Sequence, residues 1–273
     1  MKLPIPTHNI SNDEYHNTLT ELSSSDLKKF YRKSGRHFEH DKLQRNIETP
    51  AMALGTAFHA MILEPDVFEE SYVIQPEFKP TELDKEGKVK AKTKGWKNTT
   101  DYKDQLKNFR KANAGFSILT EKDNDMLKAM RVSFEAHPMY REYFGHAEGH
   151  NEATYVGDFK VRCDRICHVN GKNVIIDIKT TDDASPDAFK RKALGMDYDL
   201  SAALYMGVTE TTEFIWAVQE RDAPYSCCWY NVSDWLKESG NKKLNIALSN
   251  LREQELPMGG YMGYKAEGGI VDL

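Results

Sequence analysis

The residues of this chain that are best suited to chemistry stand in a β-branched stretch, NVIIDIKTT, at positions 173–181. In a β-strand, residues two positions apart share a face, so the side chains of Asp177 and Lys179 point to one side while the neighbouring isoleucines point to the other. One face of this strand is therefore polar and the other is packed. A carboxylate and an amine held together in this way fit a reactive site or a structural ion pair.

A second carboxylate is predicted to face Asp177 across a hairpin. Asn170-Gly171 is the strongest short hairpin signal in the chain, and a two-residue turn there pairs residues whose numbers sum to 341. This register places Asp164 opposite Asp177, with β-carbons about 5 Å apart. Two carboxylates so placed repel each other unless a proton or a cation lies between them. Mg²⁺ or Mn²⁺ would relieve the repulsion, because both prefer oxygen ligands and bind water and phosphate at their remaining positions.

In such a site Lys179 would orient or help to deprotonate an attacking water and balance charge on a phosphate. The alternative is a structural charge cluster, since buried ionic networks also occur. The Asp-x-Lys spacing is weak by itself, because an acidic residue two positions before a lysine occurs six times in the chain. The apolar strand and the opposed Asp164 give the pattern its weight, and the residues alone leave both interpretations open.

Hydrophobic patterns predict the elements that must position these residues, a mixed sheet with helical cover. Strands are expected at residues 152–158, 159–169, 173–181, 213–219 and 226–230. Helices are expected at residues 19–33, 49–65, 120–137, 185–194, 199–209 and 232–253. Thr49 before Pro50, and Thr120 three residues before Asp123, are typical helix starts.

Length and composition favour one domain over residues 1–273. We expect an N-terminal helical part at about 19–140 and a catalytic core at about 150–255, since 40% of the 273 residues are hydrophobic and can fill a core. Residues 76–113 are rich in lysine and almost free of aliphatic residues, which predicts an exposed excursion. A solvated loop is the favoured interpretation of that excursion, and a basic flap over a polyanion is the alternative.

Several classes of protein are disfavoured by the sequence. No run of 18 apolar residues and no apolar leader segment is present, so we expect a cytoplasmic protein with no membrane contact. The four cysteines lack metal-binding spacing and are expected to act as small core residues. A net charge of −5 argues against general affinity for nucleic acid, although a site that binds phosphate through metal ions needs acidic ligands.

At RCDRI and IIDIKTT the chain resembles the P-D-(D/E)-x-K nuclease superfamily, and more closely the exodeoxyribonuclease VIII-like family of phage and prophage recombination nucleases. Four further segments resemble that family in order and spacing: LSSSDLKKF, LGTAFHAMILEP, DLSAALYMGV and FIWAVQERDAPYSCCWY. The resemblance covers most of the chain. It implies an α/β fold with a restriction-endonuclease-like core, in which a mixed central β-sheet is flanked by helices.

The resemblance also implies site residues. His59, Asp164, Asp177 and the Ile178 carbonyl would bind the catalytic metal, Lys179 would be the catalytic lysine, and Glu152 would hold a second metal or a water. Alone, His59 would be expected to pack on a helix face. Residues implied near DNA are Ser25, Arg36, Arg162 and Tyr205, with Ser25 and Arg36 at a terminal 5′-phosphate. Helix capping by Ser25 and ordinary surface exposure of Arg36 are the competing interpretations.

Two positions depart from the family pattern. Cys163 replaces the usual proline before the first aspartate, which removes no ligand. Ser201 replaces the glutamine of the Gln-x-x-x-Tyr element while Tyr205 is retained, so any contact of the amide is in doubt.

The function implied is a DNA exonuclease that depends on Mg²⁺, with Mn²⁺ as a substitute. It would resect linear duplex ends from 5′ to 3′ and leave a 3′ single strand for a single-strand annealing recombination protein. A ring-shaped homo-oligomer encoded by a phage or prophage and working in the bacterial cytoplasm is part of the same implication. Alternatives are a single-strand-specific or endonucleolytic member of the superfamily, and a non-catalytic DNA-binding protein of the same fold.

Overall fold

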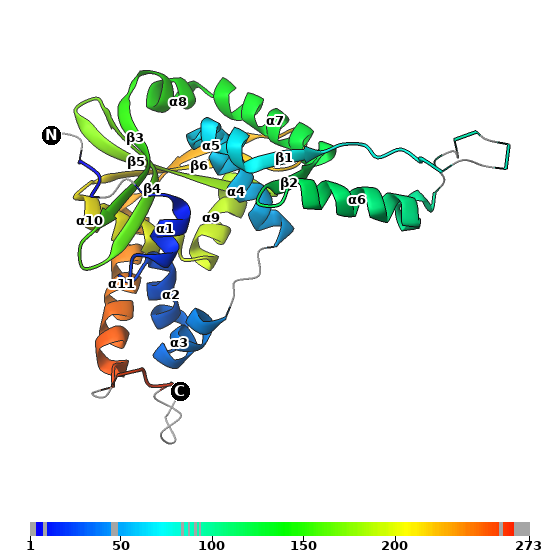
Figure 1. The fold of residues 1–273 in the computed structure, drawn as a ribbon. Helices are drawn as coiled ribbons and strands as arrows, with labels where there is room; N and C mark the ends of the chain where they lie inside the picture. Colours follow the sequence, from blue (N-terminus) through cyan, green and yellow to red (C-terminus); the bar gives the residue numbers. More distant parts are fainter. Residues whose placement is uncertain are drawn as a thin grey trace.

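A five-stranded mixed sheet forms the centre of the molecule (Figure 1). The computed structural model describes residues 4–7, 10–44, 49–82, 85–86, 88–89, 92, 94–256 and 259–264, with only the backbone of residues 12 and 13. The strands lie side by side in chain order, and only β5 and β6 are parallel. They are β3 (Glu148–Val156), β4 (Lys160–Val169), β5 (Lys172–Thr181), β6 (Glu213–Glu220) and β7 (Cys227–Asn231). The mixed sheet with helical cover predicted from the sequence is confirmed.

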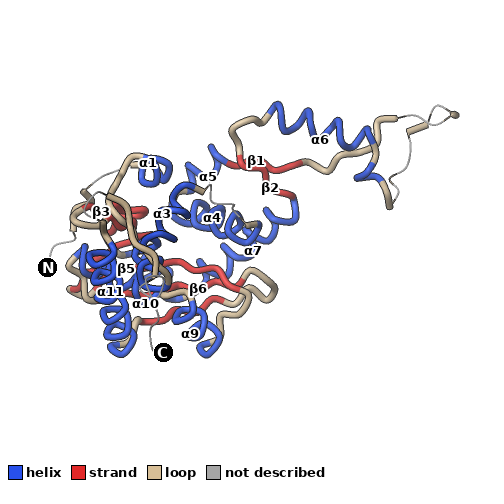
Figure 2. The backbone as a smooth tube through the Cα atoms, turned by 90° about the horizontal axis from the view of Figure 1, so that it is seen from below, coloured by secondary structure: helices blue, strands red, loops and turns tan. Residues whose placement is uncertain are grey.

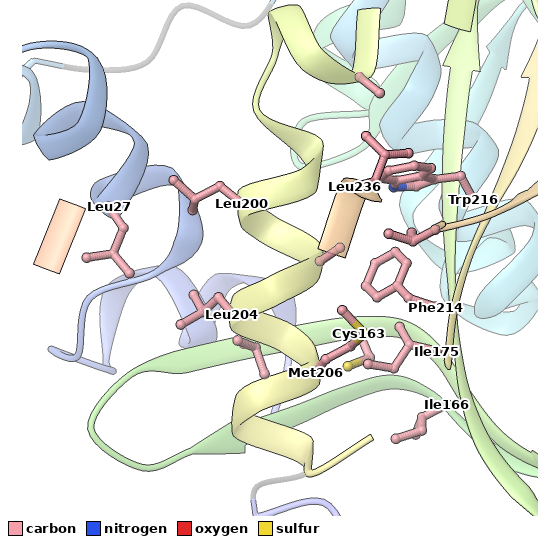
Figure 3. Packing of buried hydrophobic residues seen from close by; sticks show 14 of the residues in the cluster. Leu27, Cys163, Ile166, Ile175, Leu200, Leu204, Met206, Phe214, Trp216 and Leu236 are labelled. Carbon is pink, nitrogen blue, oxygen red and sulfur yellow. The ribbon is translucent and has the colours of Figure 1, made fainter. Parts of the chain in front are cut away.

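One face of the sheet is covered by the helices that join β5 to β6. A parallel pair needs such a crossover, here α9 (Pro186–Gly195) and α10 (Tyr198–Thr209). Figure 3 shows α10 between α2 (Ser24–Arg32) and the sheet, with Leu200 directed toward Leu27 of α2. Ile175 and Trp216 belong to the same buried cluster, together with side chains of α11 (Asp234–Gln254).

The other face of the sheet packs against α4 (Pro50–Leu63) and α7 (Glu121–Ala136). Phe58 of α4 and Phe134 of α7 meet edge to face with ring centroids 5.6 Å apart. Ile176 and Ile178 of β5 belong to this second cluster, whereas Ile175 belongs to the first. Because β5 is covered on both faces, its sequence is a nearly continuous apolar run, and the charged pair that follows stands out against it.

Local capping explains where the predicted helices begin. The Thr49 side chain accepts a hydrogen bond from the Met52 N–H directly before Pro50, and the Thr120 side chain accepts one from the Asp123 N–H. The elements that the sequence did not predict are α1 (Asn12–Asn17), α3 (Gly35–Leu43), α5 (Pro65–Ser71), β1 (Tyr72–Gln75), a 3₁₀ turn (Trp96–Asn98), α6 (Thr100–Ala112), β2 (Ser117–Thr120), α8 (Pro138–Tyr140) and a π-helix (Arg141–His146). Most of these are too short to show a clear hydrophobic period.

Residues 76–116, which we call the arm, leave the body between β1 and β2. Figures 1 and 2 both show α6 projecting away from the main sheet. The Lys-rich excursion predicted at residues 76–113 is exposed, but it is not a plain loop, because it contains α6 and the 3₁₀ turn. Rings of Phe78, Trp96, Tyr102 and Phe109 contact one another and replace the missing aliphatic residues. Aromatic side chains therefore give the arm a small core of its own.

No helix in the described part of the chain is both long enough and apolar enough to cross a membrane.

Candidate active site

The candidate site lies where β4 and β5 separate. The turn at Asn170-Gly171 has positive φ angles of 50° and 78°, and the ladder from it pairs residues whose numbers sum to 341, which confirms the predicted register. This ladder ends at the Arg165–Ile176 pair. Beyond that rung, β4 stays paired with β3 and β5 with β6. The two strands therefore fork just before the next predicted rung, which would be Asp164 opposite Asp177.

Asp164 bridges the fork with its side chain. Its Oδ2 atom accepts a hydrogen bond of 2.6 Å from the backbone N–H of Ile178. The N–H would otherwise be left without a ladder partner, so the carboxylate takes the place of a strand carbonyl. This contact fixes the position of Asp164 relative to β5.

His59 reaches the same point from α4. Its Nε2 lies 2.8 Å from the Ile178 carbonyl oxygen and 3.5 Å from Asp164 Oδ2. The adjacent Phe58 is fully buried in the core between α4 and the sheet, which fixes the direction of the His59 side chain. Three donor atoms from α4, β4 and β5 therefore converge, from residues more than 100 positions apart in the chain for the helix and the strands.

These donors fit a hard divalent cation. Neighbouring ligands of an octahedral ion with bonds of about 2.1 Å are about 3 Å apart, close to the two separations measured at His59. To bind a cation, His59 would have to give up the Nε2 proton that it directs to the Ile178 carbonyl. Among the described residues, no group of three or more His, Cys, Asp and Glu side chains is arranged as a metal site. The third donor of this set is a backbone carbonyl.

Asp177 and Lys179 form an ion pair beside these donors. Lys179 Nζ lies 2.5 Å from Asp177 Oδ2, and the Asp177 side chain is largely buried. Burial raises the pKa of Asp177. Burial also disfavours the charged form of Lys179, but the negative charges of Asp177 and Asp164 outweigh it and raise the lysine pKa above its usual value. Lys179 is thus an ammonium group here, suited to holding a phosphate or orienting water rather than to taking a proton.

Glu152 faces the fork from β3 in an unusual backbone conformation. Its φ of 49° is in the left-handed region, which is strained for a residue with a side chain and is often found at functional sites. Its Oε2 lies 2.5 Å from Nε of Arg162. Burial, together with the charge of Asp164, raises the pKa of Glu152 to about 7. Glu152 therefore adds a third acidic group at the fork, neutralised by an arginine of the same sheet.

A cavity of about 380 Å³ opens at these residues. Six of the residues singled out from the sequence line it: Ser25, His59, Glu152, Arg162, Asp164 and Tyr205. Burial raises the pKa of Tyr205 far above its usual range, so its phenol is available as a hydrogen-bond donor.

The remaining predicted residues have other positions. Asp177, Ile178 and Lys179 are connected to the cavity through the contacts of Asp164 and His59. Arg36 does not line the cavity; it begins α3, and its backbone N–H donates to the Met262 carbonyl. Arg162 pairs with β3 and with Glu152, and the rung that would place it opposite Lys179 is not part of the ladder.

Two residues near the ion pair were missed by sequence reasoning. The ring of Tyr198 lies between two ammonium groups, with its centroid 5.2 Å from Lys179 Nζ and 5.3 Å from Lys28 Nζ. Burial and the like charge of Lys179 lower the pKa of Lys28 to about 8. Lys28 is one turn after Ser25 and Tyr198 directly precedes the DLSAALYMGV segment, so the signal was proximity to motifs already noted.

Comparison with known families decides the fold family. The model of a PDDEXK-like domain of unknown function (DUF3799) matches residues 23–255, which include the three strands and both helices that supply the site. The chain belongs to this PDDEXK-like family. The predicted membership of the superfamily and the predicted restriction-endonuclease-like core are thereby confirmed.

Solved structures of low sequence identity share the fold. A candidate exonuclease from Eubacterium rectale superposes with a TM-score of 0.58 at 13% identity, over 90% of this chain and 86% of that chain. A phage-related exonuclease from Haemophilus somnus 129PT gives a TM-score of 0.33 at 14% identity, over 88% and 97% of the two chains. An alkaline exonuclease from Laribacter hongkongensis gives 0.28 at 12% identity, over 57% and 81%. No curated protein matches the chain.

Proposed function

We propose that this PDDEXK-like protein is a metal-dependent DNA exonuclease that uses Mg²⁺, with Mn²⁺ as a substitute. The observation that carries the proposal is the convergence of His59 Nε2, Asp164 Oδ2 and the Ile178 carbonyl within 2.8 to 3.5 Å, next to the Asp177–Lys179 pair. A hard-cation donor set beside an ammonium group matches the needs of phosphodiester hydrolysis better than those of a purely structural ion cluster.

Each side chain has a role in this proposal. His59, Asp164, Asp177 and the Ile178 carbonyl would hold the ion, which when bound activates water and stabilises negative charge on the scissile phosphate. Lys179 orients the attacking water and neutralises a phosphate oxygen from its place beside Asp177. Glu152 is the remaining acid at the fork and would hold a second ion or a water. Its pKa near 7 keeps it able to exchange a proton.

Residues on the cavity wall would bind the nucleic acid. The Ser25 hydroxyl and the Tyr205 phenol both line the cavity and are suited to phosphate oxygens, and the Arg162 guanidinium adds positive charge there. Arg36 stays a weaker candidate, since it lies outside the cavity wall.

The finer features of the proposal come from the resemblance to phage recombination nucleases. These are 5′ to 3′ resection of linear duplex ends, a ring of subunits around DNA, delivery of the 3′ strand to an annealing protein, and work in the cytoplasm of a bacterial host. A single nuclease domain over residues 1–273 is part of the same proposal.

A direct test uses linear duplex labelled at either end, with and without Mg²⁺. We expect stepwise release of nucleotides from the 5′ end, dependent on the metal and abolished by Asp177→Ala. Lys179→Ala should retain duplex binding but lose turnover by at least about 100-fold, the scale on which positioned catalytic groups act. Cleavage that survives Asp177→Ala would remove the site assignment. Equal cleavage of closed circular DNA would identify an endonuclease instead.

A further inference from the structure

We propose that the basic face of α6 is a docking surface for the phosphate backbone of duplex DNA that extends beyond the cavity. This docking face consists of Lys103, Lys107, Arg110 and Lys111. It deepens the proposed function, because it assigns the position of the substrate outside the cavity, and it rests on that function only for the identity of the duplex as substrate.

The distribution of charge along the chain is the first observation. Residues 76–116 contain eleven Lys and Arg residues and six Asp and Glu residues, a net charge of +5. The whole chain has a net charge of −5, so the remaining residues have a net charge of −10. An acidic body repels a polyanion at long range, and the arm is the part of the chain that can offset this repulsion.

The arrangement of these charges on α6 is the second observation. Lys103, Lys107 and Lys111 follow a spacing of four residues and share one side of the helix with Arg110. All four are exposed, and none forms an ion pair within the described part of the chain. The stripe spans about 12 Å of helix, a length over which a duplex carries about seven phosphate charges.

The inner side of α6 has a different task. Tyr102 and Phe109 contact Phe78, with ring centroids 5.6 and 5.9 Å apart. Asp101 at the start of the helix accepts hydrogen bonds of 2.7 Å from both the N–H and the hydroxyl of Thr81. The helix is thus held on the arm by its aromatic side and its first turn, and stability of the arm does not require the basic stripe.

Stabilisation of the helix does not explain all of the stripe. Arg110 and Lys111 lie in the last turn, where positive charge interacts favourably with the helix dipole. Lys103 is near the beginning of the helix, where the same dipole disfavours a cation, and Lys107 is in the middle. A helix selected only for its own stability would carry acidic residues at the position of Lys103.

The attachment of the arm points the stripe toward the cavity. β1 and β2 are parallel, with Tyr72 paired to Ser117, and both of these residues line the cavity. The last residue of α6, Ala112, is five positions before Ser117. Nucleic acid that enters the cavity must therefore leave it close to the C-terminal end of α6.

The chemistry of the surface favours a duplex backbone over a single strand. Proteins bind single strands by stacking bases on exposed aromatic rings. The rings of α6 are turned toward one another, and the stripe offers only ammonium and guanidinium groups. Such groups bind phosphates independently of sequence.

The test measures binding of a fluorescent 30-base-pair duplex in EDTA, so that no hydrolysis occurs, as a function of salt concentration. The arm variant is K103Q/K107Q/K111Q, and the matched control is R191Q/K242Q/R252Q. The control removes three exposed charges from α9 and α11, which contribute no residue to the cavity wall. Glutamine and lysine have similar helix propensity, and circular dichroism checks that the helical content is preserved.

We expect the arm variant to reduce the slope of log K against log salt by about 2 to 3, as three lost phosphate contacts predict, and to weaken duplex binding at least tenfold. The control should bind within twofold of the wild type. Hydrolysis of the small diester bis(p-nitrophenyl) phosphate with Mn²⁺ should be unchanged in both variants, since this substrate does not reach the arm.

An unchanged slope in the arm variant, or an equal loss in the control, would overturn the docking face. So would a loss confined to a single strand of equal length. If the wild-type protein binds duplex through the arm but hydrolyses neither DNA nor the small diester, the proposed function fails while the docking face stands.

Discussion

Each acidic side chain at the fork has its own partner. Asp177 is paired with Lys179, Glu152 with Arg162, and Asp164 with the backbone N–H of Ile178. Buried charges are costly unless they are neutralised in this way, and the pairs make the site stable enough to form before a ligand arrives. Lys28 is the exception, because its printed neighbours are the Tyr198 ring and the like charge of Lys179.

The unpaired position of Lys28 predicts a pH-dependent cost in stability. Its pKa in the folded protein is about 8, against 10.5 for an ordinary lysine. Below pH 8 the folded protein must keep a charge that its surroundings disfavour, whereas above about pH 10.5 the lysine is neutral in both folded and unfolded protein. The contribution of Lys28 to the free energy of unfolding therefore rises with pH between these two values.

We expect Lys28→Met to increase the free energy of unfolding at pH 7 by on the order of 1 to 3 kcal/mol, because methionine keeps the apolar stem and removes the charge. The gain should shrink as the pH rises from 8 and vanish near 10.5. Urea unfolding of both proteins at several pH values measures it. Lys29→Met on the same helix is the control, and a gain of equal size there, or one that does not change with pH, would contradict the explanation.

Among the elements, the π-helix is held to the sheet by one buried side chain. Nε of Arg165 donates to the Tyr143 carbonyl at 2.6 Å, and its two terminal nitrogens donate to Asn151 Oδ1 at 2.7 Å and the Ala147 carbonyl at 2.9 Å. Its guanidinium also lies over the Phe144 ring, 4.8 Å from the centroid. Arg165 follows Asp164 directly but points to the other face, so it acts as a structural lock.

This lock predicts a large loss of stability without a direct effect on chemistry. Arg165→Met should lower the free energy of unfolding by about 2 to 4 kcal/mol, because three acceptors in a buried region lose their donor. The measurement is urea unfolding at pH 7. Arg131→Met is the matched control, since its pair with Glu135 is exposed and is expected to contribute less than about 1 kcal/mol. Losses of similar size in the two variants would show that Arg165 is not a lock.

The hairpin and the fork differ in how far the sequence predicts them. The register follows from Asn170-Gly171 because turn geometry is local. The end of the ladder at Arg165–Ile176 depends on the left-handed backbone of Glu152 in the next strand and on α4, which is far away in the chain. His59 could be placed only through its resemblance to a family, since a lone histidine on an apolar helix has no period that marks it as a ligand. Sequence reasoning thus identified the residues of the site, whereas their convergence needed the tertiary structure.

At the scale of the whole molecule, the fold brings a helix from one face of the sheet to a fork between two strands. The acids at this fork lie in an acidic body, while most of the positive charge is concentrated on the arm. A cation bound at the fork should therefore stabilise the entire fold, since it links α4, β4 and β5, which are joined there only by the contacts of His59 and Asp164.

Thermal unfolding with and without Mn²⁺ tests this link independently of DNA and of turnover. At a Mn²⁺ concentration 100 times the dissociation constant, binding adds about 2.7 kcal/mol to the free energy of unfolding, which corresponds to a rise in Tm of roughly 5 °C or more for a chain of this size. Asp164→Asn should lose most of the rise. Its amide oxygen can still accept the Ile178 N–H, so the loss would report the missing charge rather than a broken fork. Asp125→Asn, on the exposed side of α7, should keep the full rise. A rise of equal size in the wild type and in Asp164→Asn would mean that the ion binds elsewhere, because a cation held by carboxylate and imidazole at the fork cannot be indifferent to that charge.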